Sequence, residues 1–310
     1  MKSLSLVLAL IPTIAPGASA LAQTPTPPAR TAPQESKPRL EAWPALAGEA
    51  AKTAQSDVER VRKAHTEEMS DLGRAGLVQA GAGAAPLLLA ALGKEKDENV
   101  RARLVAILDQ VTDATHTRLL AKEFTSKSRD VRLYVLGRCA LYPDPELRAA
   151  AEGVLARLVQ SGEKADPDER YVAALCATST GSTAGLLALH AAAIEGWNKR
   201  GVQIRAALEG VRGPAASAVV VGLLKDSDTP KANDPLLPKA DRQRVVACLN
   251  LLAGCGDKST LSRARAFLDS NDNTVRVAAI NAVLGIAENK PPVADLSAFE
   301  AVELAKKLKN

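Results

Sequence analysis

The residues that could serve as nucleophiles, bases or metal ligands are few and lie far apart along the chain. Ser161 and Lys164 have the S-x-x-K spacing of penicillin-binding enzymes, but the K-T-G triplet that completes such a site occurs nowhere in the sequence. His65, His116 and His190 follow one another at 51 and 74 residues, whereas paired metal ligands stand roughly three to six residues apart. H-E-x-x-H, G-x-S-x-G and phosphate-loop motifs are missing as well. These residues predict no catalytic centre, no cofactor and no metal site.

A loop over residues 226–240 holds a dense group of acidic and amide side chains. Their spacing is loosely similar to a calcium loop, but the glycine and the final glutamate of an EF-hand are missing, and Lys231 intrudes. Leu236 and Leu237 stand between two prolines, where apolar side chains on a loop can be covered by a partner. We expect either a plain insertion or a partner contact at Leu236 and Leu237, and no metal.

Trp197 lies at the corner between two helical patterns, 184–195 and 199–211. A large aromatic side chain at such a corner is typical of a binding hot spot. More often, a lone tryptophan at such a corner packs between neighbouring helices. Both interpretations stay open, and Trp197 joins Leu236 and Leu237 as a candidate partner-binding residue.

Six arginines mark the elements that must position these residues. Each one opens a stretch rich in Ala, Leu and Val with helical periodicity, as in RARLVAIL and RVAAINAVL. The intervals between them are 31, 38, 30, 44 and 32 residues, a period typical of stacked two-helix repeats. The longest interval contains the 226–240 loop. The six are Arg101, Arg132, Arg170, Arg200, Arg244 and Arg276.

An aspartate or asparagine precedes most of these arginine-led helices and can accept hydrogen bonds from their first free N–H groups. The candidates are Asp97 or Asn99, Asp130, Asp168, Asn198, Asp241, and Asn271 or Asp272. Because the acids neutralise the helix starts, we interpret the arginines as a structural ladder, with an anion-binding edge as the alternative. Strand patterns are almost absent. The sequence therefore predicts an all-α fold.

Three of the segments, DENVRARLVAIL, SRDVRLYVLGRCA and NDNTVRVAAINAVLGI, resemble the second helix of HEAT repeats, particularly the short form of the phycobilisome lyases. The resemblance covers about residues 70–290, and the middle repeats keep the arginine but lose the Val-Arg pair. It implies a right-handed superhelix of two helix layers, with protein–protein binding as the common role. It implies no substrate.

The expected layout has a leader, a linker and a solenoid. Residues 1–22 have a positive start, a short apolar run and a small-x-small site, which together indicate a secretory signal peptide cleaved after Ala22. Residues 23–45 are rich in proline and polar residues and are expected to be a disordered linker. Residues 46–310 are expected to form an α-solenoid of about six two-helix repeats (about 84–290) with capping helices, the last over 296–308.

Composition limits the partners and the membrane interpretation. The net charge of +5 is mild, basic and acidic residues alternate, and aromatic residues make up 3% of the chain, a pattern that argues against nucleic-acid binding. The leader is too short to span a bilayer, and we expect no membrane-spanning segment elsewhere. We interpret the four cysteines as small residues that are buried like hydrophobic ones. Disulfides Cys139–Cys176 or Cys248–Cys255 stay open, since export permits them.

Together these patterns predict a secreted or periplasmic, non-catalytic scaffold that binds another protein through a solenoid surface. Two alternatives stay open. One is an enzyme or enzyme-accessory subunit of the HEAT-like lyase type. The other is a binder of anionic envelope polymer through the arginine edge.

Overall fold

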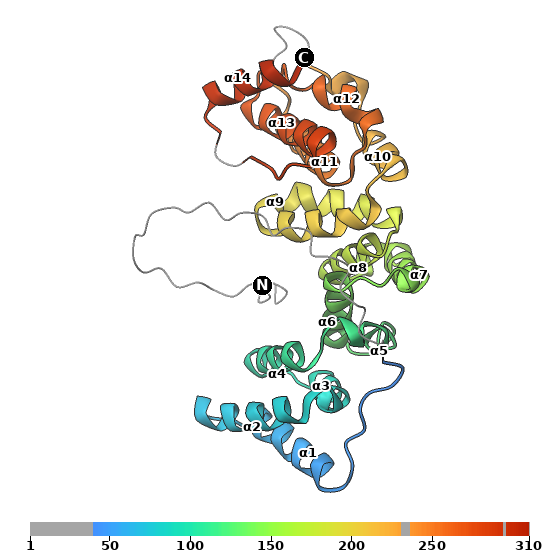
Figure 1. Ribbon diagram of the computed structural model, residues 1–310, viewed down its shortest axis with the longest axis vertical. Helices are drawn as coiled ribbons and strands as arrows, with labels where there is room; N and C mark the ends of the chain where they lie inside the picture. Colours follow the sequence, from blue (N-terminus) through green and yellow to red (C-terminus); the bar gives the residue numbers. More distant parts are fainter. Residues whose placement is uncertain (1–39, 231–235, 294–295, 310) are drawn as a thin grey trace. The chain divides into compact units, whose positions relative to one another are not determined.

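The computed structural model describes residues 40–230, 236–293 and 296–309. Every regular element in these ranges is helical (Figure 1), so the prediction of an all-α fold is confirmed for the described part of the chain. The predicted signal peptide, 1–22, and the greater part of the predicted linker, 23–45, lie outside the described residues. They stay predictions.

The chain divides into two compact units, which are described one at a time. The N-terminal unit runs to Lys122 and includes Ser126–Leu133. The C-terminal unit holds Glu123–Thr125 and the chain from Tyr134 onward. Helix α6 (Arg129–Leu141) contains the change from one unit to the other.

Short helices that pack on their neighbours make up the N-terminal unit. The first helix, α1, contacts α2, α3 and α4, and its Val61 is fully buried together with Leu77, Leu88 and Leu104 of the other three. Burial of such side chains is the main favourable contribution to packing. The elements are α1 (Gly48–Arg62), α2 (Glu67–Ala80), η2 (Gly81–Ala84), α3 (Ala85–Leu92), α4 (Glu98–Val111), η3 (Ala114–His116) and α5 (Thr117–Ala121).

Local capping explains where these helices begin and end. The chain before the first expected repeat forms two helices, because Thr66 accepts a hydrogen bond from the N–H of Met69 and starts α2. Asp97 accepts from the N–H groups of Asn99 and Val100 and starts α4. Gly81 ends α2 with a φ of +62°, a value that favours glycine.

The last residues of the predicted linker contact the N-terminal unit. The N–H of Leu40 donates to the carbonyl of Thr115, and Lys122 donates to the carbonyl of Glu41. The Trp43 ring stacks on His116 with 5.5 Å between ring centres. The chain from Leu40 therefore lies against η3 and α5 and does not run free up to residue 45.

The C-terminal unit is a succession of helices in which α8, α9, α11 and α13 contact one another in chain order (Figure 1). On the flanks, α7 packs on α8, α10 on α11, α12 on α13 and, at the far end, α14 on α13. The helices are α7 (Arg148–Gln160), α8 (Pro167–Ser179), α9 (Leu186–Leu208), α10 (Pro214–Val221), α11 (Lys239–Cys255), α12 (Leu261–Arg265), α13 (Asn273–Glu288) and α14 (Ala298–Lys309).

Four of the expected caps, Asp130, Asp168, Asn198 and Asp241, are wrong, because each lies inside a helix. Asp166, not Asp168, caps α8, because Pro167 occupies the first helical position where a missing N–H costs nothing. Pro238 precedes α11, and Asp241 lies within its first turn. Asp130 and Asn198 lie within α6 and α9, so neither starts a helix. Asp272 caps α13 as expected.

Helix α9 joins two predicted helices across a kink. Gly196 has non-helical angles, φ −172° and ψ 60°, and separates the expected 184–195 and 199–211 stretches. Arg200 donates across this kink to Glu195 at 3.0 Å. The predicted corner at Trp197 is therefore a bend within one continuous helical run.

Among the described residues, one helical stretch is long and apolar enough to cross a membrane by length and composition alone. It is Glu67–Leu92, with a mean hydropathy of 1.6, and 44% of its most apolar window is buried inside the protein. The stretch is interrupted at Gly81 by η2, and its Leu77, Leu88 and Leu92 are buried. The expectation of no membrane-spanning segment stays a prediction.

Candidate partner-binding surface

The side chains of the six arginines bind carboxylates or backbone carbonyl oxygens. Three pair with acids: Arg101 lies 3.3 Å from Asp130, Arg200 lies 3.0 Å from Glu195 and 3.9 Å from Asp168, and Arg244 lies 2.6 Å from Asp228. Four donate to a carbonyl oxygen in the turn after the preceding helix: Arg132 to Ser126, Arg170 to Gly162, Arg244 to Leu223 and Arg276 to Ser270. The guanidinium groups thus hold turns or neutralise acids.

Arg244 has the most extensive set of partners. Its guanidinium donates to both carboxylate oxygens of Asp228 at 2.6 and 2.7 Å, to Asp241 at 2.9 Å and to the carbonyl of Leu223 at 3.0 Å. The Asp228 side chain is only 3% exposed. Burial alone would raise the pKa of Asp228, but the hydrogen bonds from Arg244 and from the N–H of Lys225 outweigh it and hold that pKa below 3.8. This cluster fastens the start of the 226–240 loop to α11.

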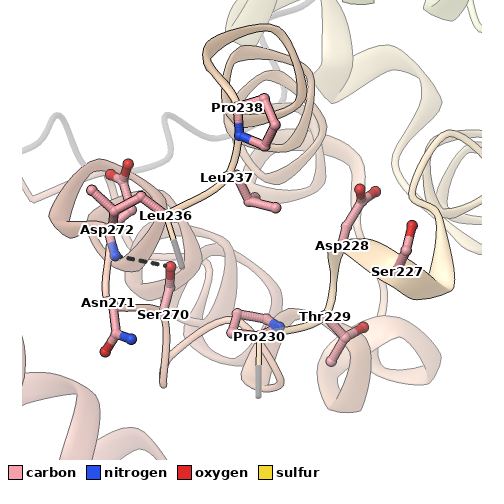
Figure 2. A pocket seen from close by; sticks show the side chains of 10 residues that line it. All are labelled: Ser227, Asp228, Thr229, Pro230, Leu236, Leu237, Pro238, Ser270, Asn271 and Asp272. Carbon is pink, nitrogen blue, oxygen red and sulfur yellow. Dashed lines mark hydrogen bonds between the residues drawn. The ribbon is translucent and has the colours of Figure 1, made fainter. Parts of the chain in front are cut away.

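The described part of that loop lines a pocket of about 280 Å³. Figure 2 shows Leu237 pointing into the space between Asp228 and the turn that carries Ser270 and Asn271. Leu236 lies at the rim and is 60% exposed. Both candidate leucines therefore line a hollow of the C-terminal unit. Residues 231–235, which complete the loop, lie outside the description.

Trp197 lines a second hollow, a groove of about 390 Å³ between α9, α11 and the start of α13, here called the α9–α11 groove. The groove is lined by Ala193–Lys199, Arg242, Gln243, Val246, Ala247, Asn250 and Thr274. Helices α9 and α11 pack against each other along the groove. The kink at Gly196 places Trp197 at its edge.

The Trp197 ring is held by its own helix. A Cβ atom at Gly201 would lie 2.9 Å from the ring, so the ring rests directly on the glycine backbone one turn further along. The Arg205 guanidinium lies 5.5 Å from the ring centre on the next turn, within cation–π range. The ring is half-buried, and it is therefore fixed in place before any partner arrives.

Asn250 lies on the wall of the same groove and is only 9% exposed. No described residue forms a hydrogen bond with its carboxamide. Its polar atoms keep contact with solvent in the groove, so they are open to hydrogen bonds from a bound molecule. Nothing in the sequence RVVACLNLL distinguishes this asparagine from a core position of an apolar helix, and our sequence analysis missed it.

An ion pair joins the two hollows. Arg242, which lines the α9–α11 groove, donates at 3.0 Å to Asp272, which lines the loop pocket. Asp272 is 7% exposed, and it also accepts from the N–H of Thr274. The structure therefore brings Trp197 and the two leucines onto adjoining parts of the C-terminal unit, with this pair between them.

The structure also places His190 beside Cys248, a contact that their separation of 58 residues concealed. The Nε2 atom of His190 lies 3.2 Å from the Cys248 sulfur and 3.3 Å from the carbonyl oxygen of Arg244. Burial raises the pKa of the Cys248 thiol to about 12 and lowers the pKa of His190. Because the sulfur is fully buried, this pair lacks the accessible thiolate that nucleophilic catalysis requires.

The remaining residues with reactive side chains line neither hollow. His116 stacks on Trp43 in the N-terminal unit, and His65 is exposed before α2. Ser161 donates to the carbonyl of Arg157, and Lys164 ends the short helix that follows. Within the described ranges, no group of three or more His, Cys, Asp or Glu side chains could hold a metal ion. The four cysteines are buried and reduced.

Comparison of the chain with protein-family models, with curated proteins and with solved structures gives no match.

Proposed function

We propose that this chain is a HEAT-like α-solenoid scaffold that binds another protein through the C-terminal unit and has no catalysis of its own. The solenoid assignment is supported by the chain-order contacts of α8, α9, α11 and α13. It is also supported by the recurrent place of the arginines, each in the first turns of a helix or just after a kink. In a repeat protein each repeat buries its apolar face on its neighbours.

The observation that carries the binding role is the α9–α11 groove. It combines a fixed, half-buried tryptophan, a residue type typical of binding hot spots, with a carboxamide to which no described residue bonds. Leu236, beside the adjoining pocket, adds an exposed apolar side chain. The anionic-polymer alternative has weaker support, because the six arginines are bonded to acids or turn carbonyls.

The proposed place of action is the bacterial envelope or the outside of the cell. This part of the proposal depends on the leader pattern of residues 1–22. A protein partner in the same compartment would then meet the folded units after cleavage.

Site-specific photo-crosslinking in cells that produce the full chain tests this function. A photoreactive phenylalanine analogue at position 243, which is exposed and lines the groove, should give a discrete protein adduct. The same analogue at position 202 is the matched control, because Val202 is 62% exposed on α9 and lies outside the groove lining. Equal adducts at both positions, or no protein adduct at 243, would refute a binding role for this surface.

A further inference from the structure

We propose that the α9–α11 groove binds an extended, acidic–apolar peptide segment of the partner, with the Asn250 carboxamide pairing with the main chain of that segment. This inference rests on the protein-binding function proposed above and adds the chemistry of what is bound.

The Asn250 side chain supplies the first argument. A carboxamide offers two N–H donors and one carbonyl acceptor. No described residue bonds to them here, and they keep contact with solvent in the groove although the residue is only 9% exposed. A peptide unit supplies a matching carbonyl and N–H only when its main chain is not already hydrogen-bonded within a helix or sheet. The groove therefore suits an extended segment, as in other modes of recognition that depend on the main chain.

Trp197 supplies the second argument. Its ring already lies against Gly201 and Arg205, so little side-chain entropy is lost when a partner binds to it. The groove lining also includes the apolar residues Ile194 and Val246. A large aliphatic or aromatic side chain of the segment would be covered between them.

The charges around the groove supply the third argument. Glu195 is paired with Arg200, and Arg242 is paired with Asp272. The Lys199 ammonium, by contrast, has no ion-pair partner among the described residues, although it lines the groove. The helical segment that begins after Gly196 adds its positive end to this charge. The unbalanced positive charge favours an acidic residue next to the apolar one.

Selection from a phage-displayed library of random dodecapeptides on the full chain tests the proposal. We expect enriched peptides to share an acidic residue beside a large apolar one. Asn250→Ala should weaken their binding at least tenfold, and Trp197→Ala should do the same. Lys199→Gln should weaken it several-fold and remove its salt dependence. Gln160→Ala removes an exposed amide outside the groove and should leave the affinity unchanged.

Circular dichroism of Asn250→Ala guards against misfolding, since loss of an unpartnered amide should leave the helical signal and the melting temperature intact. A tight peptide should also lose affinity when the peptide bond facing Asn250 is N-methylated. Equal binding to wild type and Asn250→Ala, or no enrichment at all, would overturn the inference. A further control uses the Trp43→Phe variant without peptide, in which only Trp197 emits. If deleting residues 23–39 shifts this emission, the chain's own segment occupies the groove, and the inference is overturned as well.

The two proposals fail in different ways. If the protein adduct at position 243 persists in Asn250→Ala, and the crosslinked part of the partner is not an extended segment, the scaffold function stands and the peptide assignment is wrong. Absence of any adduct at position 243 would remove both.

Discussion

Replacing Arg244 by methionine should destabilise the C-terminal unit more than any exposed charge change. The substitution keeps an apolar stem but removes four hydrogen bonds, two of them to the carboxylate of Asp228. Asp228 would keep the N–H of Lys225 at 2.7 Å and would carry an uncompensated charge at 3% exposure. Breaking a buried pair in this way costs roughly 3–5 kcal/mol.

We expect a loss near the lower end, about 3 kcal/mol, because Arg244 is 18% exposed and Asp241 39%. For a unit of this size, each kcal/mol lowers the melting temperature by roughly 2–4 °C, so the expected shift is about 6–12 °C. Thermal unfolding followed by circular dichroism measures it. Arg148→Met is the matched control, because the Arg148–Glu152 pair is exposed on one helix and contributes less than about 1 kcal/mol.

The stability difference between the wild type and Arg244→Met should also depend on pH, in a direction that the structure predicts. In the wild type the pKa of Asp228 lies below 3.8, so its stabilising contribution is complete above that pH and is lost as the pH falls through the lowered value. Without Arg244, burial dominates and raises the pKa of Asp228 in the folded state. The variant then gains relative stability as the pH falls, and its deficit should be smaller at pH 4.5 than at pH 7.5.

Two results would refute this reasoning. One is a melting temperature for Arg244→Met within about 2 °C of the wild type, the range expected for a surface pair. The other is a deficit that grows as the pH falls. A double variant, Asp228→Asn with Arg244→Met, should recover part of the loss, because the buried charge is gone.

Three further predictions concern packing, thiols and the groove. Gly285→Ala should destabilise by about 1–3 kcal/mol in urea unfolding, because its Cβ would overlap the carbonyl oxygen of Ala253. At Gly153, within a helix, an added Cβ would meet open space, so Gly153→Ala should stabilise by roughly 0.5–1 kcal/mol. If Gly285→Ala proved more stable than Gly153→Ala, the packing described here would be contradicted. The four buried cysteines should react with a thiol reagent at pH 8 only after denaturant is added, when all four react. Asn250→Leu should not lower the melting temperature, since no described residue bonds to the amide that is removed; a fall would indicate a hidden partner.

The helical elements follow closely from the sequence, because their signals are local. The arginine-led apolar stretches predicted α4, α6, α8, α11 and α13 near their observed bounds. Asp97 and Asp272 predicted two helix starts, since a cap acts on N–H groups two or three residues away. The cap of α8 was misplaced by two residues, because the proline that follows Asp166 was not given its usual first helical position.

The candidate surface was only partly predictable. Trp197, Leu236 and Leu237 were found from the sequence because a bulky aromatic at a corner and leucines in an insertion stand out locally. Asn250 was not, since its neighbours in the chain are apolar and resemble an ordinary core.

The sequence by itself determined which segments are helical and where large side chains interrupt the pattern, because those properties depend on residues within a few positions of one another. Only the tertiary structure decided which polar side chains have a hydrogen-bond or ion-pair partner. Arg242 meets Asp272 across 30 residues, and His190 meets Cys248 across 58. Whether a polar group gains or lacks a partner depends on how α9, α11 and α13 pack, and burial makes that difference costly.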